Sequence, residues 1–534
     1  MGKKKPAIVP DQVTIALSDP GMTVMHKAGL AGLWMTLKAF EQDKKLMREV
    51  PTGAGWKLDR TSVTLVYGSE PKRLFDRLIQ ESFKLDKGLF WFPALGKPAD
   101  NVQQAVVRQA AMLGTFLQHG LTRKADPSSD KKGSANTVID ELPHVLQYRK
   151  VSSYAHQKQN IFPGKPVPLA GWCLPGGSER HSAYGETKLA ETAVRALALR
   201  FAPVGAICFE IKTRGQGVRP AYSLVLPEVT NLEQYARSRA LFMQYGVKQL
   251  HAAGSADAGM RVLAELHAAG LLPDLRSAQC RVISFGTVPW STQQKTRVHL
   301  FTVRASAEDA LTLYRKCTNW LPSSLIRREG KEPFWDVPLV PDLVAQNIST
   351  GKAWYLWYLG FAKLIADKDR GDHVLGFMRD RRGRLIGIRT GEKGGLATMI
   401  ADKATFREGP ERTFVLACHE AWRRRMGQIG DKARREGSSF HDQVQREFVR
   451  MRTSFARCKN ATTLREAVTD FWARAGGPIA PLQQGWSDVL ILMDDWRKAK
   501  DLALLALASY KPASKDEEAA LEAEPGDTRK GGTI

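Results

Sequence analysis

The stretch His26-Lys27-Ala28-Gly29-Leu30-Ala31-Gly32-Leu33 follows a strand-like run, Val13–Leu17, and opens a helix. The same mixture continues through the first three fifths of the chain, where β-branched or alternating runs indicate strands and apolar residues three or four apart indicate helices. Further strands are expected at Ser62–Tyr67, Ala206–Thr213, Ala221–Leu226, Arg281–Val288 and Arg297–Val303, and helices at Lys72–Phe83, Val102–Leu117, Leu189–Arg200 and Leu232–Ala253. The pattern predicts an α+β fold, a mixed α/β body, for residues 1–345.

The chain changes character after a proline-rich stretch between Trp320 and Gly351, which predicts a linker and a domain boundary near residue 345. Beyond it, apolar residues repeat at helical spacing along one predicted seam: Phe440, Val444, Phe448, Met451 and Phe455. Further helices are expected at Arg412–Ile429, Leu464–Ala475 and Trp486–Tyr510. Together they predict an all-α bundle over residues 346–512, followed by a disordered tail over 513–534.

The charge of the chain is its most unusual property. It has 534 residues, with 79 Lys and Arg against 55 Asp and Glu, a net charge of +24. Such an excess repels itself unless a polyanion offsets it, so nucleic acid is the expected partner. The six cysteines show no metal-binding spacing and are expected to be reduced and mostly buried. Without an N-terminal apolar leader, a cytoplasmic location is expected.

No membrane-spanning segment is expected. The most apolar stretch, Ala353–Ala366, is interrupted by Lys363 and is shorter than the roughly 20 residues that a spanning helix needs. It is interpreted as a buried helix.

Motifs for catalysis are incomplete. Glu210 and Lys212 match the E-x-K half of a metal-dependent nuclease, but that site needs another acid on a neighbouring strand. The alternative is an ordinary strand with Phe209 and Ile211 facing inward and the charges in water. Asp494-Asp495 fall in a helical pattern and are interpreted as a solvated helix face. No phosphate-binding loop or nucleophile elbow is present, and no cofactor is expected.

Basic clusters give the stronger signal. Met378–Ile388 predicts a hairpin whose tip carries guanidinium groups: Arg379, Arg381, Arg382 and Arg384. Residues 403–465 hold 15 Lys and Arg against 7 Asp and Glu. There the arginines suited to a strand-binding groove are Arg423, Arg424, Arg425, Arg434, Arg435 and Arg450. In each place a charged, solvated surface would look the same.

Three polar loops of the N-terminal body are candidates for contact with a DNA groove, because amide and basic side chains pair with base edges and glycine lets backbone approach. Their residues are Lys131, Lys132 and Asn136; Arg214, Gln216 and Arg219; and Gln293, Gln294 and Lys295. Ordinary loop tips share this composition.

The opening motif at residues 26–33 is similar to that of MYXAN-type, I-B-like large subunits of type I CRISPR effector complexes (Cascade). Val66-Tyr67-Gly68-Ser69 and Phe90-Trp91-Phe92-Pro93 resemble the same family. Those subunits carry a globular N-terminal body and a helical C-terminal domain, which fits the expected plan. These motifs are structural signatures and not a catalytic fingerprint.

The resemblance implies a non-catalytic subunit of an antiviral ribonucleoprotein. Guide RNA reads the target by pairing, while the protein inspects a short flanking motif, the PAM, on duplex DNA and stabilises the opened strands, the R-loop. The implied partners are guide RNA, target double-stranded DNA, the other Cascade subunits and a helicase-nuclease recruited in trans. The N-terminal body would inspect the PAM and dock on the guide ribonucleoprotein, and the helical domain would act like a small subunit that holds strands.

Two other functions stay open on sequence alone. One is a metal-dependent nuclease built on Glu210 and Lys212, and the other is a stand-alone RNA-binding protein, although no ribonucleoprotein consensus is present. In several relatives the helical region is also made separately from an internal start codon. Met399 stands where such a start would leave 136 residues, and a core methionine is the alternative.

Overall fold

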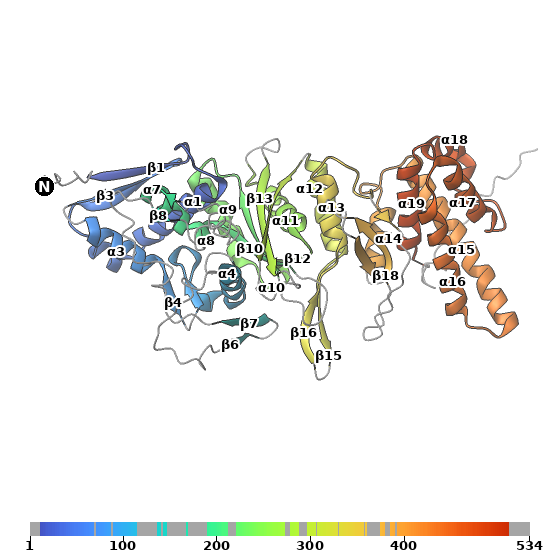
Figure 1. Ribbon diagram of the computed structural model, residues 1–534, viewed down its shortest axis with the longest axis horizontal. Helices are drawn as coiled ribbons and strands as arrows, with labels where there is room; N and C mark the ends of the chain where they lie inside the picture. The colour runs from blue at the N-terminus through green and yellow to red at the C-terminus, as the bar shows by residue number, and fades with distance from the viewer. Residues whose placement is uncertain are drawn as a thin grey trace, which may run out of the picture. The chain divides into compact units, whose positions relative to one another are not determined.

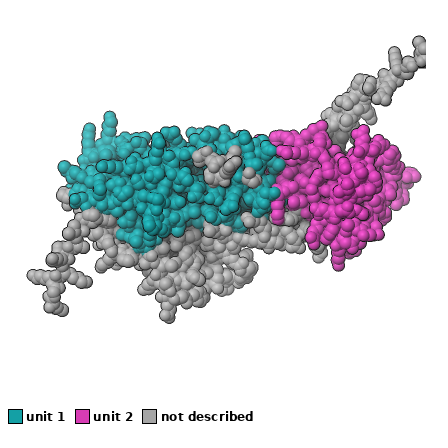
Figure 2. Space-filling model, turned by 90° about the horizontal axis from the view of Figure 1, so that it is seen from above, with its two compact units in different colours: residues 1–315, 322–351 teal, residues 316–321, 352–534 magenta. Residues whose placement is uncertain are grey.

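The computed structural model describes residues 11–68, 71–86, 89–114, 136–139, 142–146, 167–168, 190–211, 221–272, 278–287, 296–305, 307–328, 331–356, 358–359, 374–379, 385–389 and 392–511. The chain divides into two compact units (Figure 2): residues 1–315 with 322–351 form unit 1, and residues 316–321 with 352–534 form unit 2. Sheets and helices mix in unit 1, and helices fill the region 393–509, so the predicted α+β fold with a helical C-terminal region is confirmed. Compactness does not test independent folding, and the boundary near 345 stays a prediction.

Unit 1 begins with strands and helices in alternation (Figure 1). Its first elements are β1 (Gln12–Ala16), α1 (Val24–Glu41), α2 (Lys44–Arg48), β2 (Ala54–Leu58), β3 (Ser62–Tyr67), α3 (Pro71–Ser82), β4 (Lys84–Asp86), β5 (Leu89–Trp91), α4 (Val102–Gly114), β6 (Asn136–Ile139), β7 (Leu142–Leu146), β8 (Val167–Pro168) and β9 (Ala190–Glu191). It continues with α7 (Ala193–Arg200), α8 (Ala202–Gly205), β10 (Ile207–Ile211), β11 (Ala221–Pro227), α9 (Leu232–Leu241), α10 (Val247–Leu250), β12 (His251–Ala252), α11 (Ser255–Ala268), β13 (Gln279–Thr287), β14 (Thr296–Arg304), α12 (Glu308–Trp320), β15 (Ser324–Arg328), β16 (Lys331–Asp336) and α13 (Val340–Ile348).

Unit 2 holds a small sheet and a helical bundle. Its elements are β17 (Tyr358–Leu359), β18 (Val374–Arg379), β19 (Leu385–Arg389), α14 (Lys393–Ala401), α15 (Pro410–Glu436), α16 (Phe440–Arg457), α17 (Ala461–Ala473), α18 (Leu482–Leu492) and α19 (Trp496–Ser509). Every residue from Leu502 to Ser509 is buried. A helix that is apolar all round must be enclosed, and α19 packs against all five other helices of the bundle.

The opening motif allows helices to pack at very short range. Helix α1 crosses α7 and α8, and a Cβ at Gly29 or Gly32 would collide with the carbonyl oxygen of Ala198 or Phe201. A Cβ at Gly205 would collide in turn with the carbonyl of Ala28. The glycines are therefore required by the close approach of helix backbones, which is the role of small residues at close crossings.

The largest sheet of unit 1 has the order β12-β10-β11-β13-β14, with β10 and β12 parallel and the other pairs antiparallel. Helix α11 packs on β11, β13 and β14, whereas α4 packs on β10 and β11. All five residues of β10 are buried. The expectation that the charge of Glu210 lies in water is wrong, because β10 is an inner strand of this sheet.

A carboxylate from α13 caps helix α11, which has no side-chain cap of its own at Gly254. Asp342 Oδ1 accepts a hydrogen bond from the backbone N–H of Asp257 at 2.9 Å, and its Oδ2 accepts one from Gln346 Nε2 at 2.7 Å. Gly254 leaves room for this carboxylate, since a Cβ there would overlap it. Burial raises the pKa of Asp342 to about 6.

The strands expected in unit 1 are confirmed, with boundaries that agree to within two residues, but four other expectations are wrong. The helix expected at Leu232–Ala253 is interrupted: α9 ends at Leu241, α10 follows, and residues 251–252 pair with β10 as a strand. The expected linker is folded: it forms the β15–β16 hairpin and then α13, whose first turn accommodates Pro341.

The other two corrections lie in unit 2. Residues 358–359 of the expected buried helix form an edge strand beside β18. The helix expected at Trp486–Tyr510 is two helices, because Asp495 ends the first pattern and caps α19 by accepting a hydrogen bond from the N–H of Lys498. Asp494 and Asp495 therefore lie at a helix break and not within a helix.

Candidate nucleic-acid interface

Helices α15 and α16 form an antiparallel hairpin (Figure 1), and α15 is the longest helix among the described residues. Gly437 ends α15 in the left-handed region at φ 63°, and Ser439 caps α16. The first half of α15 buries Phe414, Ala421 and Trp422 among others, but beyond Trp422 only Ile429 and Ala433 are buried. The distal half of the hairpin is therefore a polar projection whose side chains can meet a partner.

Six of the predicted arginines lie on this hairpin. Arg423 and Arg424 both donate to the Glu420 carboxylate, at distances of 2.6–2.9 Å. These hydrogen bonds hold the pKa of Glu420 below its ordinary value, and the one from Arg423 has the largest effect. Arg425 donates to Glu447 on α16 at 3.0 Å. The three adjacent arginines are thus ion-paired.

Arg450 also faces Glu447, at 3.7 Å, and Arg434 pairs with Asp431 at 2.8 Å while remaining 81% exposed. The side chain of Arg435 donates to the Asp431 carbonyl. Glu420 and Glu447 thus serve four arginines between them, so positive charge remains in excess along the hairpin. Guanidinium groups in this setting are suited to phosphate, since they offer paired donors at fixed geometry.

The other predicted clusters are described only in part. The hairpin expected at Met378–Ile388 is confirmed as β18 paired with β19, with Arg379 opposite Leu385. Arg381, Arg382 and Arg384 lie outside the described residues, and the Arg379 side chain is not described.

Of the three polar loops, Asn136 alone falls in the described part, as the first residue of β6. Lys131, Lys132, Arg214, Gln216, Arg219, Gln293, Gln294 and Lys295 lie outside it. Their role in DNA binding stays a prediction.

The nuclease alternative meets a geometric difficulty. The Glu210 carboxylate lies 3.3 Å from His251 Nδ1, and both side chains are 0% exposed. Tyr222 stands opposite Glu210 on β11, and burial together with this carboxylate raises its pKa. Lys212 lies outside the described residues. Within the described ranges no three His, Cys, Asp or Glu side chains are grouped to hold a metal ion.

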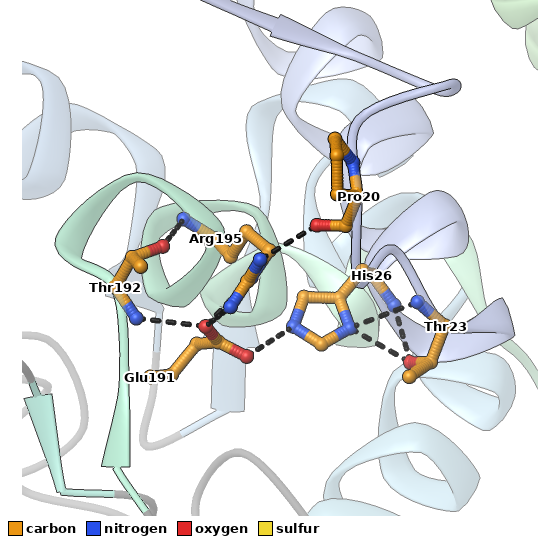
Figure 3. Close-up of polar contacts among 6 residues, drawn as sticks. All are labelled: Pro20, Thr23, His26, Glu191, Thr192 and Arg195. Carbon is orange, nitrogen blue, oxygen red and sulfur yellow. Dashed lines mark hydrogen bonds and ion pairs between the residues drawn. The ribbon is translucent and has the colours of Figure 1, made fainter.

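The opening motif contains a buried polar network (Figure 3). His26 lies at the third position of α1, where its Nδ1 accepts hydrogen bonds from the backbone N–H and the hydroxyl of Thr23. Its Nε2 donates to Glu191, whose other oxygen accepts from Arg195 Nε at 2.6 Å and from the N–H of Thr192 at 2.7 Å. Arg195 also reaches the carbonyl of Pro20. The network joins the start of α1 to β9 and α7.

The pKa shifts in this network favour neutral His26 beside ionised Glu191. Burial lowers the pKa of His26, and the nearby carboxylate opposes that effect only in part. Burial by itself raises the pKa of Glu191, but the hydrogen bonds from Arg195 and Thr192 bring it below its ordinary value. His26 thus has a structural role as a helix cap and tether.

Comparison with known proteins gives the family. Residues 14–200 match the DevT N-terminal domain and residues 403–531 match the DevT C-terminal domain, which together span more than half of the chain. The CRISPR-associated protein Cas8a1/Csx13 of Myxococcus xanthus (strain DK1622) is 28% identical over 94% of this chain and 89% of that protein. The chain belongs to the family of type I CRISPR large subunits. Both the His26 network and the α15–α16 hairpin lie within the two DevT matches.

One residue of this DevT-family chain departs from its expected role. The spacing of Phe440 places it on the apolar seam of its helix, yet it is 44% exposed, whereas Phe448, Met451 and Phe455 are buried. Sequence reasoning missed this exposure. The available signal was the pair Gly427 and Gly430, since glycines are unusual inside a helix and mark this part of α15 as different from a packed core helix.

None of the helices in the described part of the chain is both long and apolar enough to cross a membrane.

Proposed function

We propose that this chain is the non-catalytic large subunit of an RNA-guided type I CRISPR interference complex. It would recognise the PAM on duplex DNA, stabilise the R-loop and recruit a separate helicase-nuclease. The observation that carries the proposal is the similarity to Cas8a1/Csx13 along 94% of the chain. The basic hairpin α15–α16 supports it, because an opened DNA strand supplies the phosphates that these arginines are suited to bind.

The proposal divides the work between the two parts of the chain. The N-terminal body would read the PAM through the loops at 131–136, 214–219 and 293–295, where amide and basic side chains are available for base edges. The helical domain would hold an opened strand along α15 and α16, and the 379–384 turn would add further arginines for phosphate. Guide RNA and the other Cascade subunits complete the assembly.

The two rival functions make different demands on the chain. A nuclease based on Glu210 needs a carboxylate that reaches metal and substrate, but that carboxylate is fully enclosed beside His251. A stand-alone RNA-binding protein would bind without partner subunits. The burial of Glu210 and the DevT matches favour the large-subunit function over both rivals.

Reconstitution tests the proposed function. The chain is combined with guide RNA and the subunits encoded beside its gene, and binding to duplex targets that differ only in the flanking motif is measured. We expect tight binding to depend on this chain, on a matching guide and on one class of flanking motif. Equal binding with and without the chain, or tight RNA binding by the chain alone without assembly, would contradict the proposal.

A further inference from the structure

Phe440 is an exposed aromatic residue at the end of a projecting hairpin. It is the first residue of α16 and keeps 44% of its surface exposed. The seam that its spacing predicts is buried only from Phe448 onward, at 8% for Phe448 and 0% for Phe455. The ring is therefore accessible to a ligand, and an aromatic ring offers such a ligand a flat surface for stacking.

The Phe440 ring borders a shallow hollow of about 380 Å³. The hollow is lined by Gly430, Ala433, Arg434, Gly437, Ser438 and Phe440. Its lining combines an aromatic ring, bare backbone and one guanidinium group.

Two glycines inside α15 are not required by close packing. A Cβ at Gly427 would meet nothing within 4 Å, and one at Gly430 would meet only the Phe440 ring, at 3.6 and 3.8 Å. Each helix-interior glycine is nevertheless unfavourable by about 0.5–1 kcal/mol relative to alanine. The fold does not need these glycines. Gly430 differs from Gly427 in that it lines the hollow, where a Cβ would touch the Phe440 ring.

The charged side chains around the hollow form exposed ion pairs that an anionic ligand can displace. Arg434 lines it and is 81% exposed, and its partner Asp431 is 64% exposed. Lys432 and Glu436 form a second pair at 3.8 Å, also in solvent. Exposed pairs of this kind are worth about 0–1 kcal/mol, so phosphate can replace the carboxylates.

We propose that the hollow is a stacking site for one unpaired base of single-stranded nucleic acid. The base would lie against the exposed part of the Phe440 ring, while Arg434 binds the adjoining phosphate. This inference rests on the proposed function and names the form of nucleic acid that the α15–α16 hairpin holds. An aromatic ring with a neighbouring cation is a sequence-tolerant device, since every base has a flat face.

The test compares two ligands on the purified full-length chain: an oligothymidylate and an abasic oligomer of equal length. Phe440→Ala should weaken oligothymidylate binding about 5- to 150-fold, the equivalent of the ~1–3 kcal/mol usual for one stacked base. Binding of the abasic oligomer should not change. Phe440→Tyr should retain binding, whereas Phe440→Leu, which keeps apolar volume without an aromatic face, should not.

Two glycine variants form a matched pair. Gly427→Ala and Gly430→Ala should both raise the melting temperature, because alanine favours helix. Only Gly430→Ala should weaken oligothymidylate binding, since Gly427 does not line the hollow. A stability effect alone would change both variants alike.

The remaining outcomes separate the two proposals. If the wild-type chain binds both oligomers equally and Phe440→Ala has the same affinity, the stacking site is wrong while phosphate binding by the arginines still stands. A wild-type chain or assembled complex that binds no single strand would overturn the strand-holding function as well. If Phe440→Ala binds the oligomers normally but the complex loses a subunit, the hollow is a contact site for that protein subunit and the stacking site is wrong.

Discussion

His26 and Glu191 stand 165 residues apart in the chain and form a buried pair, with 3.2 Å between His26 Nε2 and Glu191 Oε2. The pair fixes the start of α1 against the segment that leads into α7, and close helix crossing at Gly29 and Gly32 follows directly after it. The motif by which the chain resembles its family is thus a joint between helices.

Removing the imidazole should destabilise unit 1. His26→Ala removes the imidazole that donates to Glu191 Oε2 and accepts from Thr23, and we expect a loss of about 1–3 kcal/mol in the free energy of unfolding. Urea denaturation measures this. Lys27→Ala is the matched control: its ion pair with Glu228 is partly exposed at 3.7 Å, and a change below about 1 kcal/mol is expected.

The same pair should make stability depend on pH in a defined direction. Burial lowers the pKa of His26 below 6.5, so the unfolded chain binds the proton first as pH falls. The stability contributed by neutral His26 is present above pH 6.5 and is lost below it. His26→Gln should remove this part of the pH dependence, and an unchanged profile would show that His26 does not titrate on unfolding.

Asp342 should contribute the opposite dependence. Its pKa in the folded chain is raised from 3.8 to about 6, so the folded state holds the proton more tightly. The associated stability is greatest below pH 3.8 and is lost as pH rises through 6. Asp342→Asn can still accept the N–H of Asp257 but does not titrate. The stability of this variant relative to the wild-type chain should therefore be higher at pH 8 than at pH 5, by on the order of 1 kcal/mol. Asp342→Ala, which removes the cap, should lose stability at both pH values.

Binding by the arginine cluster should show in the salt dependence of DNA affinity. Neutralising Arg423, Arg424 and Arg425 together should make the plot of log K against log salt less steep. The expected change in slope is about 0.7–0.9 for each phosphate that the variant no longer neutralises. Arg497→Gln, an exposed site on α19, serves as the control. An unchanged slope would remove the cluster from the interface.

Arg425 needs separate treatment in that experiment, because its removal leaves Glu447, 8% exposed, with Arg450 as a more distant partner. The double variant Arg423→Gln with Arg424→Gln avoids this effect. Circular dichroism of each variant separates unfolding from a specific loss of DNA binding.

The purified chain should leave DNA and RNA intact in Mg²⁺ or Mn²⁺. The nuclease alternative requires Glu210, whose carboxylate is enclosed between β10 and its neighbours. Glu210→Gln should therefore alter the stability of the fold, and no cleavage should be seen with either the wild-type chain or the variant. Metal-dependent cleavage that disappears in this variant, with the fold intact, would establish the nuclease instead.

Translation from Met399 should yield a C-terminal fragment of the helical domain. The DevT C-terminal match begins at residue 403, close to this start, and α15–α19 would remain whole. Met399 is itself 0% exposed within α14, so the fragment would begin inside that helix. Intact-mass analysis of complex made from the native gene should find a fragment beginning there. Its absence, or its persistence after Met399→Leu, would contradict the prediction.

Local patterns determined most of the elements of this protein. Alternation and β-branching placed β3 at Ser62–Tyr67, and helical spacing placed α3 and α15, because these periodicities report which face of a segment is buried. Net charge and the basic run near residue 423 likewise depend on composition alone, and both are evident without the fold.

Tertiary structure decided what local periodicity cannot encode. Pairing with β10 turned residues 251–252 from helix to strand, and inner-strand position buried Glu210. The cap on α11 comes from Asp342, a residue 85 positions away, and the partner of His26 is more distant still. Phe440 has the spacing of a core residue but lies where the hairpin extends past the bundle. Burial depends on which distant segments arrive to cover a side chain, and that is a property of the packed chain and not of the local sequence.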